Sequence, residues 1–201
     1  MLALFSASTL FTFGVAAAAI VAAPGPGQAL VLTRTLEGGI RPGLWTAFGL
    51  EIGTIVHTFA AALGLSAILA TSAMAFAIVK YLGAAYLLWL GIRAFRSAHE
   101  DTREAEDRQE QRRTSYLVAH AAVTGILNPK VAIFFLAFLP QFVDPARGRV
   151  VWQFVLLGFA FATLGFLGDS LVAGVAGRAR RRLVTGTRSA LWRERATGSV
   201  L

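Results

Sequence analysis

The stretch VVWQFVLLGFAFATLGFLG, residues 150–168, contains no charged side chain, and neither do residues 1–33, 58–79 and 131–143. Hydrophobic residues make up 56% of the 201-residue chain and charged residues 15%, whereas a typical soluble domain is about a quarter charged. A run of about 18 or more apolar residues is long enough to cross the hydrocarbon core of a bilayer. The sequence therefore predicts an all-α, polytopic integral membrane protein.

The charge distribution excludes several classes of protein. The net charge is +8, but the basic residues lie between the apolar runs and form no continuous basic segment interleaved with aromatics, so nucleic-acid binding is not expected. The chain has no cysteine, which excludes disulfides and cysteine-based metal sites, and we expect neither a metal nor a cofactor. Because the first charge is Arg34, the N-terminus lacks the basic region of a cleaved signal peptide and is predicted to remain as a span.

The apolar runs predict five membrane spans in a single transmembrane domain, residues 1–201. The spans cover about residues 2–36, 43–70, 74–95, 116–142 and 150–176. A short polar loop, residues 37–42, separates the first two, and the hydrophilic segment 97–113 divides the domain into a first repeat of about 1–96 and a second of about 114–201.

Orientation follows from lysine and arginine, which favour the cytoplasmic side. If the spans alternate, the connection after the first span, the connection after the third and the tail share one side, and they hold most of the arginines. The other side has only Arg147 and Arg149. The sequence thus predicts that these two connections and the Arg-rich segment 178–195 are cytoplasmic and that the N-terminus lies outside.

Proline breaks the first span of each half. Pro24 and Pro26 release the carbonyls of Ile20 and Ala22, and Pro129 releases that of Gly125, because proline has no N–H and its ring obstructs the carbonyl four residues earlier. In hydrocarbon, such breaks persist only where protein or a cavity satisfies the backbone. An odd number of spans per half would give the halves opposite topology, and paired breaks of this kind mark the binding site of inverted-repeat transporters. We therefore expect two inverted three-helix repeats.

The residues around the two breaks form the predicted substrate site. A half-helix starting after the first break offers N–H groups and a positive dipole end to a carboxylate, while released carbonyls suit an ammonium group. A zwitterionic amino acid carries both groups. The alternative is a pair of kinks without a ligand, with Lys130 pairing to a carboxylate of another span. The candidate residues are Pro24, Gly25, Pro26, Gly27, Gln28, Asn128, Pro129 and Lys130.

Ionisable residues inside predicted spans are candidates for ion coupling, since a charge at the bilayer centre costs about 2.5–3.5 kcal/mol on insertion scales. Glu51 is the first candidate, followed by Asp169 and His57. The alternative for each is a polar contact between helices. His57 follows Glu51 by six residues and lies on a somewhat different helix face, so the two are not expected to pair directly.

Three segments resemble the LysE/RhtB family of amino-acid exporters. Residues 23–27, APGPG, resemble its PGP signature, residues 83–91, GAAYLLWLG, resemble its GAAYLLYLG segment, and residues 127–142, LNPKVAIFFLAFLPQF, resemble its NPK and FFLAFLPQF segments. The resemblance covers about residues 10–176. It implies efflux of amino acids or their derivatives from the bacterial cytoplasm through the plasma (inner) membrane, driven by a gradient of protons or another cation. The family usually has a sixth span, and residues 195–201 resemble its start, so the second repeat is expected to be incomplete.

Two other functions remain open at this stage. A non-transporting membrane subunit, or a truncated transporter, is favoured by the short C-terminus. A membrane-embedded enzyme is less favoured, because the three histidines form no H-E-x-x-H motif and the sequence has no G-x-S-x-G motif. The expected partners are a small-molecule substrate, the lipid bilayer and a coupling cation. The small residues Gly49, Gly53, Ala60 and Gly64 suit close helix packing, either within the chain or in a homo-oligomer.

Overall fold

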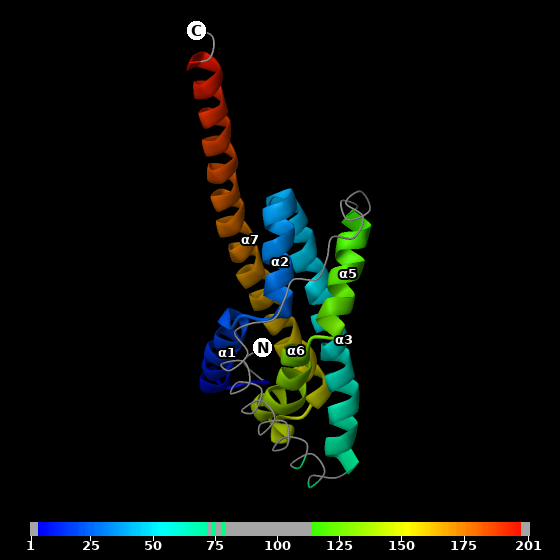
Figure 1. Cartoon of the computed structure of the whole chain (residues 1–201). Helices are drawn as coiled ribbons and strands as arrows, with labels where there is room; N and C mark the ends of the chain where they lie inside the picture. The colour runs from blue at the N-terminus through cyan, green and yellow to red at the C-terminus, as the bar shows by residue number, and fades with distance from the viewer. Residues whose placement is uncertain (1–3, 72–73, 75–77, 79–113, 198–201) are drawn as a thin grey trace.

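The computed structural model describes residues 4–71, 74, 78 and 114–197, and these residues form helices joined by short connections (Figure 1). The α-helices are α1 (Ala7–Ala22), α2 (Pro26–Gly38), α3 (Ile40–Thr71), α5 (Thr114–Ile126), α6 (Pro129–Ile133) and α7 (Val150–Thr197). A π-helix η2 (Phe134–Phe138) and 3-10 helices η3 (Leu139–Phe142) and η4 (Pro145–Arg147) join α6 to α7. Most of the predicted third span, its 83–91 segment and the loop 97–113 lie outside the described residues.

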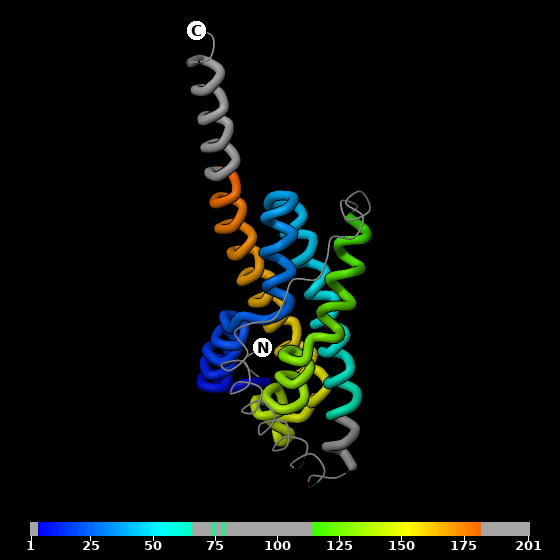
Figure 2. The backbone as a smooth tube through the Cα atoms, viewed as in Figure 1, coloured from blue at the N-terminus to red at the C-terminus, as the bar shows by residue number. Residues whose placement is uncertain are grey.

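The described helices are long and apolar enough to cross a membrane. Residues Ile40–Leu65 and Val150–Arg181 form two unbroken candidate spans with mean hydropathy 1.5 and 2.0. Two bent pairs, α1 with α2 and α5 with the segment 129–142, also qualify, with bends of 55° and 46° that Figure 2 shows along the backbone. Large apolar side chains such as Phe11 and Leu171 are 75% and 67% exposed, which suits contact with lipid. The all-α, polytopic membrane architecture is confirmed.

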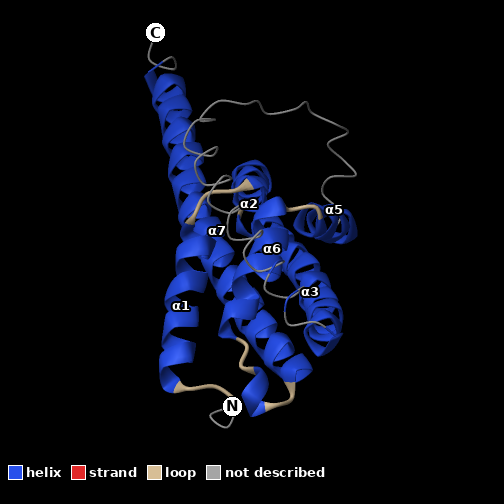
Figure 3. Cartoon of the chain, turned by 90° about the horizontal axis from the view of Figure 1, so that it is seen from below, coloured by secondary structure: helices blue, strands red, loops and turns tan. Residues whose placement is uncertain are grey.

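The helices pack around α3, which contacts both α5 and α7, while α2 packs against α3 and α7 (Figure 3). The backbones of α3 and α5 approach each other closely. A Cβ atom added at Gly53 would lie 2.5 Å from the backbone carbon of Gly125, and one added at Gly49 would lie 2.6 Å from the carbonyl oxygen of Val118. The predicted small-residue packing at these two glycines is therefore within the chain. At Gly64, no described atom comes within 4 Å of an added Cβ.

The joint between α2 and α3 is shorter than the predicted loop 37–42. Only Gly39 lies between the two helices, and its φ of 93° lies in the left-handed region that glycine adopts readily. Arg41 and Pro42 belong to the first turn of α3, where the missing N–H of proline removes no helical hydrogen bond. One glycine thus reverses the chain where the composition predicts several loop residues.

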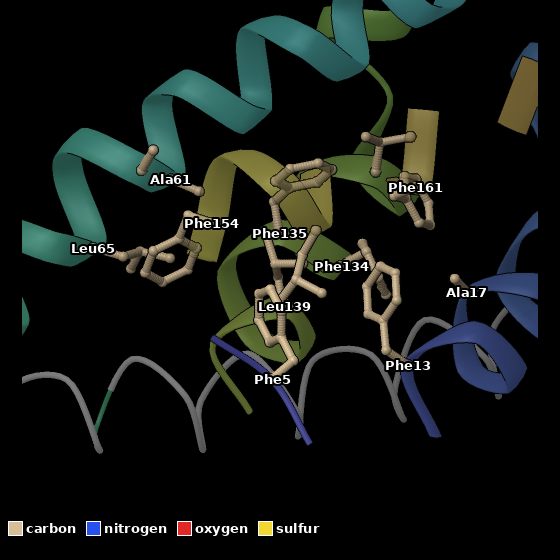
Figure 4. Packing of buried hydrophobic residues seen from close by; sticks show 13 residues of the cluster. Phe5, Phe13, Ala17, Ala61, Leu65, Phe134, Phe135, Leu139, Phe154 and Phe161 are labelled. Atoms are coloured by element: carbon tan, nitrogen blue, oxygen red, sulfur yellow. The ribbon is translucent and has the colours of Figure 1, made fainter. Parts of the chain in front are cut away.

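An aromatic core holds the second broken segment in place (Figure 4). The ring of Phe134 stacks on that of Phe161 from α7 at a centroid distance of 4.1 Å, and Phe135 meets Phe161 edge to face at 5.8 Å. Phe13 from α1 approaches Phe134 at 6.4 Å. Since α1 and α7 both contribute to it, this cluster fixes the 129–142 segment against the rest of the bundle.

The helical form of the 134–142 segment changes twice, from α to π to 3-10. Pro140 gives the reason, because its ring would clash with the carbonyl of Leu136 in a regular α-helix and it has no N–H to donate. Beyond it, buried Gln153 holds the following loop with hydrogen bonds of 2.8 Å to the N–H and carbonyl of Asp144 and the carbonyl of Gly148. The α7 helix then continues past the predicted end at residue 176, through the arginine-rich segment, to Thr197.

Candidate functional site

The two helix breaks meet in space although about a hundred residues separate them in the chain. The ammonium group of Lys130 donates hydrogen bonds to the carbonyls of Ile20 at 3.1 Å and Ala23 at 2.8 Å. A Cβ atom added at Gly25 would lie 3.5 Å from this ammonium group, so glycine allows the close approach. The side chain that follows the second break therefore satisfies the backbone released by the first.

The last turn of α1 is satisfied by side chains on both sides. The amide of Gln28 donates to the carbonyl of Val21 at 2.7 Å, and Lys130 donates to the carbonyls of Ile20 and Ala23. The expected release of the Ile20 carbonyl by Pro24 agrees with the Lys130 contact, although the N–H of Ala23 also reaches this carbonyl at 3.2 Å. Each of these donors provides a hydrogen bond to a carbonyl that would be costly to leave unsatisfied inside a membrane.

The second break is closed in a similar way. The Asn128 side chain accepts from the N–H of Lys130 at 3.0 Å and caps α6, which begins at Pro129. The carbonyl of Ile126 accepts a 3.0 Å hydrogen bond from the Nε2 atom of His57 on α3, when this nitrogen carries the proton. The carbonyl of Gly125, which Pro129 was expected to release, instead accepts from the N–H of Asn128 at 3.2 Å.

The start of α2 differs from that of α6, because its N-cap residue, Gly25, has no side chain to accept from the first turn. Pro26 occupies the first helical position, and Gly27 follows it. A Cβ atom added at Gly27 would lie 3.6 Å from the side-chain nitrogen of Asn128 and 3.2 Å from Leu50. The positive end of α2 thus lies beside the Asn128 amide without a capping group of its own.

A cavity of about 50 Å³ lies at this junction. Six helices line it: α1 and α2 on either side of the first break, α3, α5 and α6 on either side of the second break, and α7. The lining residues are Val21, Gly27, Gln28, Leu50, Glu51, Thr54, Gly125, Asn128, Lys130, Val131, Phe161, Gly165 and Asp169. A buried water needs roughly 10–15 Å³ of such volume, whereas ligand pockets usually measure about 300–1,000 Å³. The cavity has room for a few waters, and an amino acid requires it to widen.

Two carboxylates line the same cavity. Asp169 on α7 is only 7% exposed, and the Oε2 atom of Glu51 on α3 is buried without a hydrogen-bond partner. Glu51 has room only because residue 165 is glycine, where an added Cβ would lie 2.5 Å from Oε1. Lys130 is bonded to backbone carbonyls and forms no ion pair with either carboxylate. In the described part of the chain, no group of three potential ligand side chains could hold a metal.

The structure brings most of the sequence-predicted residues together. Gly27, Gln28, Asn128 and Lys130 line the cavity, and Pro24, Gly25, Pro26 and Pro129 form the breaks beside it. Of the three coupling candidates, Glu51 and Asp169 line the cavity, whereas His57 lies outside its lining and contacts Ile126 and the Phe135 ring.

Seven cavity residues were not among the sequence-predicted site residues: Val21, Leu50, Thr54, Gly125, Val131, Phe161 and Gly165. Two of them carried a usable signal. Thr54 follows Glu51 by three residues, and Gly165 precedes Asp169 by four, so each shares a helix face with a buried carboxylate. Thr54 and Gly165 are neither next to a proline break nor ionisable, so only their helix face connects them to the site.

Bent helix pairs around a buried polar cavity, in a bundle of membrane-crossing helices, are typical of secondary transporters. Comparison with known proteins agrees. The model of the LysE type translocator family matches residues 18–201, and the chain belongs to this family. Membership makes it a multi-pass membrane translocator and not an enzyme.

Among curated relatives, an uncharacterized membrane protein of Vibrio cholerae is 36% identical over 71% of this chain and 68% of its own length. A leucine efflux protein of an Enterobacter species is 32% identical over 83% of this chain and 79% of its own length. A leucine efflux protein of Klebsiella pneumoniae is 29% identical over 83% and 78%. No solved structure matches the chain.

Proposed function

We propose that this protein exports amino acids or their derivatives across the bacterial inner membrane, with the substrate bound where the two helix breaks meet. The main support is the position of Lys130. Its ammonium group donates hydrogen bonds to the carbonyls of Ile20 and Ala23, beside the start of α2, which has no capping side chain. Carbonyls that can accept from an ammonium group and N–H groups that can donate to a carboxylate thus lie next to each other. This pair of groups is complementary to a zwitterion.

The substrate carboxylate would bind at the first turn of α2 and the Asn128 amide. Gly27, in this first turn, lies beside the Asn128 amide, and the α2 dipole favours negative charge at this end of the helix. Lys130 follows the Asn128 cap by two residues. Its ammonium group would turn from the carbonyls toward the incoming carboxylate. The carbonyls of Ile20 and Ala23 would then accept the substrate ammonium group. In this exchange every donor keeps an acceptor while the cavity widens.

Glu51 and Asp169 are the proposed coupling groups. A carboxylate in an apolar bundle is costly when it is charged and unpaired, so the binding of a proton or another cation would change which state of the cavity is favoured. Glu51 has the stronger case, because its Oε2 atom is buried without a hydrogen-bond partner. The gradient would act by loading one of these carboxylates on the outer side and releasing its cation inside.

The relatives guide the choice of substrates to test. Two of them carry the name leucine efflux protein, so leucine and other aliphatic amino acids come first, followed by polar and basic amino acids. The apolar cavity residues Leu50, Val131 and Phe161 suit an aliphatic side chain. Their size would set an upper limit on the substrate.

The test is gradient-dependent uptake of labelled amino acids into inverted membrane vesicles. Unaltered protein should accumulate one substrate class, and Lys130→Gln should lower its apparent affinity by about tenfold or more, since a hydrogen bond to a charged group contributes about 1.5–3 kcal/mol. Asn128→Ala should weaken transport and cost about 0.5–2 kcal/mol of stability through loss of the α6 cap. Gly64→Ala, which no described atom approaches, is the matched control.

Failure of the unaltered protein to accumulate any amino acid would reject the exporter proposal and favour the non-transporting subunit. Normal transport by Lys130→Gln and Asn128→Ala would instead leave an exporter whose substrate binds elsewhere.

A further inference from the structure

A second cavity, of about 330 Å³, lies at the point where α2 ends, α3 begins and α7 passes. Its wall includes Gly39 and Ile40 at the joint between α2 and α3, and Arg41, Arg180 and Arg181. This cavity shares no residue with the substrate cavity. The proposed transport function gives it no role.

The ends of the candidate spans predict that this cavity lies at the boundary between membrane and water. One unbroken candidate span begins at Ile40 and the other ends at Arg181, and both residues line the cavity. Arg180 also connects this end of α7 to the end of α2, which directly precedes the span that begins at Ile40. Its Nε atom donates to the carbonyl of Leu36 at 2.8 Å and its Nη2 atom to that of Glu37 at 3.3 Å.

The cavity is strongly basic. Three arginines line it and no carboxylate does, while the nearby Glu37 is paired with Arg34 at 3.2 Å. The bonds to α2 fix the guanidinium plane of Arg180, and its Nη1 atom faces Gly39, where an added Cβ would lie 3.9 Å away. A guanidinium held in this way is suited to an anion with several oxygens, of which phosphate is the main example at a membrane surface.

An apolar stripe leads from the cavity toward the membrane interior. Leu36 and Leu32, one helical turn apart on α2, are 45% and 42% exposed, and Leu36 also supplies the carbonyl that Arg180 binds. An acyl chain can lie along this stripe while its phosphate occupies the basic cavity. This combination distinguishes a lipid from a free phosphate ion, which would gain nothing from the exposed leucines.

We propose that this cavity binds the headgroup phosphate of an anionic phospholipid, with Arg41 and Arg180 as the principal ligands. Basic pockets between membrane helices are a common form of anionic lipid site. The bound lipid would tie α2, α3 and α7 together at this end of the bundle, next to the joint that Gly39 forms. The proposal stands independently of which solute the protein transports.

The test is native mass spectrometry of the full-length protein purified in detergent and titrated with phosphatidylglycerol or phosphatidylcholine. The unaltered protein should retain phosphatidylglycerol preferentially. Arg41→Gln with Arg180→Gln should lower the apparent affinity by about tenfold or more. A double variant of equal charge change at the other end of α7, Arg147→Gln with Arg149→Gln, should keep the preference.

Arg41→Gln alone protects the test against a folding defect, because it leaves the bonds from Arg180 to α2 intact, and it should still weaken retention several-fold. Equal loss in the Arg147/Arg149 variant would overturn the proposal, since binding would then follow overall charge. Displacement of phosphatidylglycerol by an equimolar amount of inorganic phosphate would also overturn it, because a soluble anion would then be the occupant. Retention that none of these changes affects would reject the site.

Discussion

At the scale of single residues, both helix breaks are stabilised by hydrogen bonds from side chains of other helices. Lys130 on α6 satisfies carbonyls at the end of α1, and His57 on α3 satisfies the carbonyl of Ile126 at the end of α5. A released carbonyl has no water to bond in the hydrocarbon region, so each donor replaces a missing helical N–H. His57 therefore has a structural explanation that its assignment to ion coupling does not require.

Replacement of His57 separates these two roles. His57→Gln keeps a donor near the Ile126 carbonyl and should preserve stability and gradient-dependent transport. His57→Leu leaves the carbonyl unpaired and should destabilise the protein by about 1–3 kcal/mol in detergent unfolding. If His57→Gln is stable but transports without any dependence on the gradient, His57 is a coupling residue after all.

Gly165 controls the position of Glu51. An added methyl group would lie 2.5 Å from Oε1, and because this atom ends a flexible side chain, Glu51 can move aside at small cost. Gly165→Ala should therefore lower the transport rate severalfold while the unfolding temperature changes little. Gly64→Ala, also in a helix but with no described atom within 4 Å of the added methyl group, should leave transport unchanged. Equal transport by the two variants would contradict the placement of Glu51 at the working cavity.

At the scale of elements, the α3–α5 contact depends on glycine. Gly53→Ala would bring a methyl group to 2.5 Å from backbone atoms of Gly125, which cannot move without displacing α5. Overpacking of this kind typically costs about 1–3 kcal/mol, and we expect a loss of that size in thermal unfolding. Gly64→Ala is the control and should be neutral or slightly stabilising, since alanine favours the helix by up to about 1 kcal/mol. Equal stability of the two variants would contradict the close α3–α5 packing.

The sequence predicts the elements well where a single strong signal acts. Uncharged runs predict α3 and the first part of α7, and prolines predict both breaks, because span length and the missing proline N–H act locally. The breaks also predict part of the cavity, since Gln28, Asn128 and Lys130 lie next to the prolines in the chain.

Other elements depend on contacts that no local pattern reveals. The one-residue joint at Gly39 is stabilised by Arg180, which is remote in the chain and reads in the sequence as part of a solvated basic tail. Stacking of Phe134 against Phe161 on α7 fixes the position of the 129–142 segment, although Pro140 accounts for the change of helical form within it. The pairing of Lys130 with α1 likewise requires the tertiary fold. The inverted relation between the two halves stays a prediction, because the middle of the chain lies outside the described residues.

At the scale of the whole molecule, four described arginines outside the central cavity mark its two ends. Arg41 and Arg180 line one cavity, so the joint after α2 and the late part of α7 lie at the same end, as the alternating spans predict. Arg147 and Arg149 lie at the start of α7, some thirty residues and about 45 Å of helix away. Which end faces the cytoplasm follows from the excess of arginine at the first end, and it remains a prediction.

Single cysteines test this orientation directly, because the natural sequence has none. Ala146→Cys and Ala179→Cys are small changes at exposed positions, the first just before α7 and the second near the end of the candidate span Val150–Arg181. A membrane-impermeant maleimide added to intact cells should label Ala146→Cys, and Ala179→Cys should react only after the inner membrane is opened, since the positive end is held inside. The reverse pattern would invert the topology. It would also place the proposed phospholipid site in the outer leaflet and require transport in inverted vesicles to run against the proposed direction. Labelling of both positions in intact cells would point to two orientations in the membrane and weaken every argument that assigns a single direction of transport.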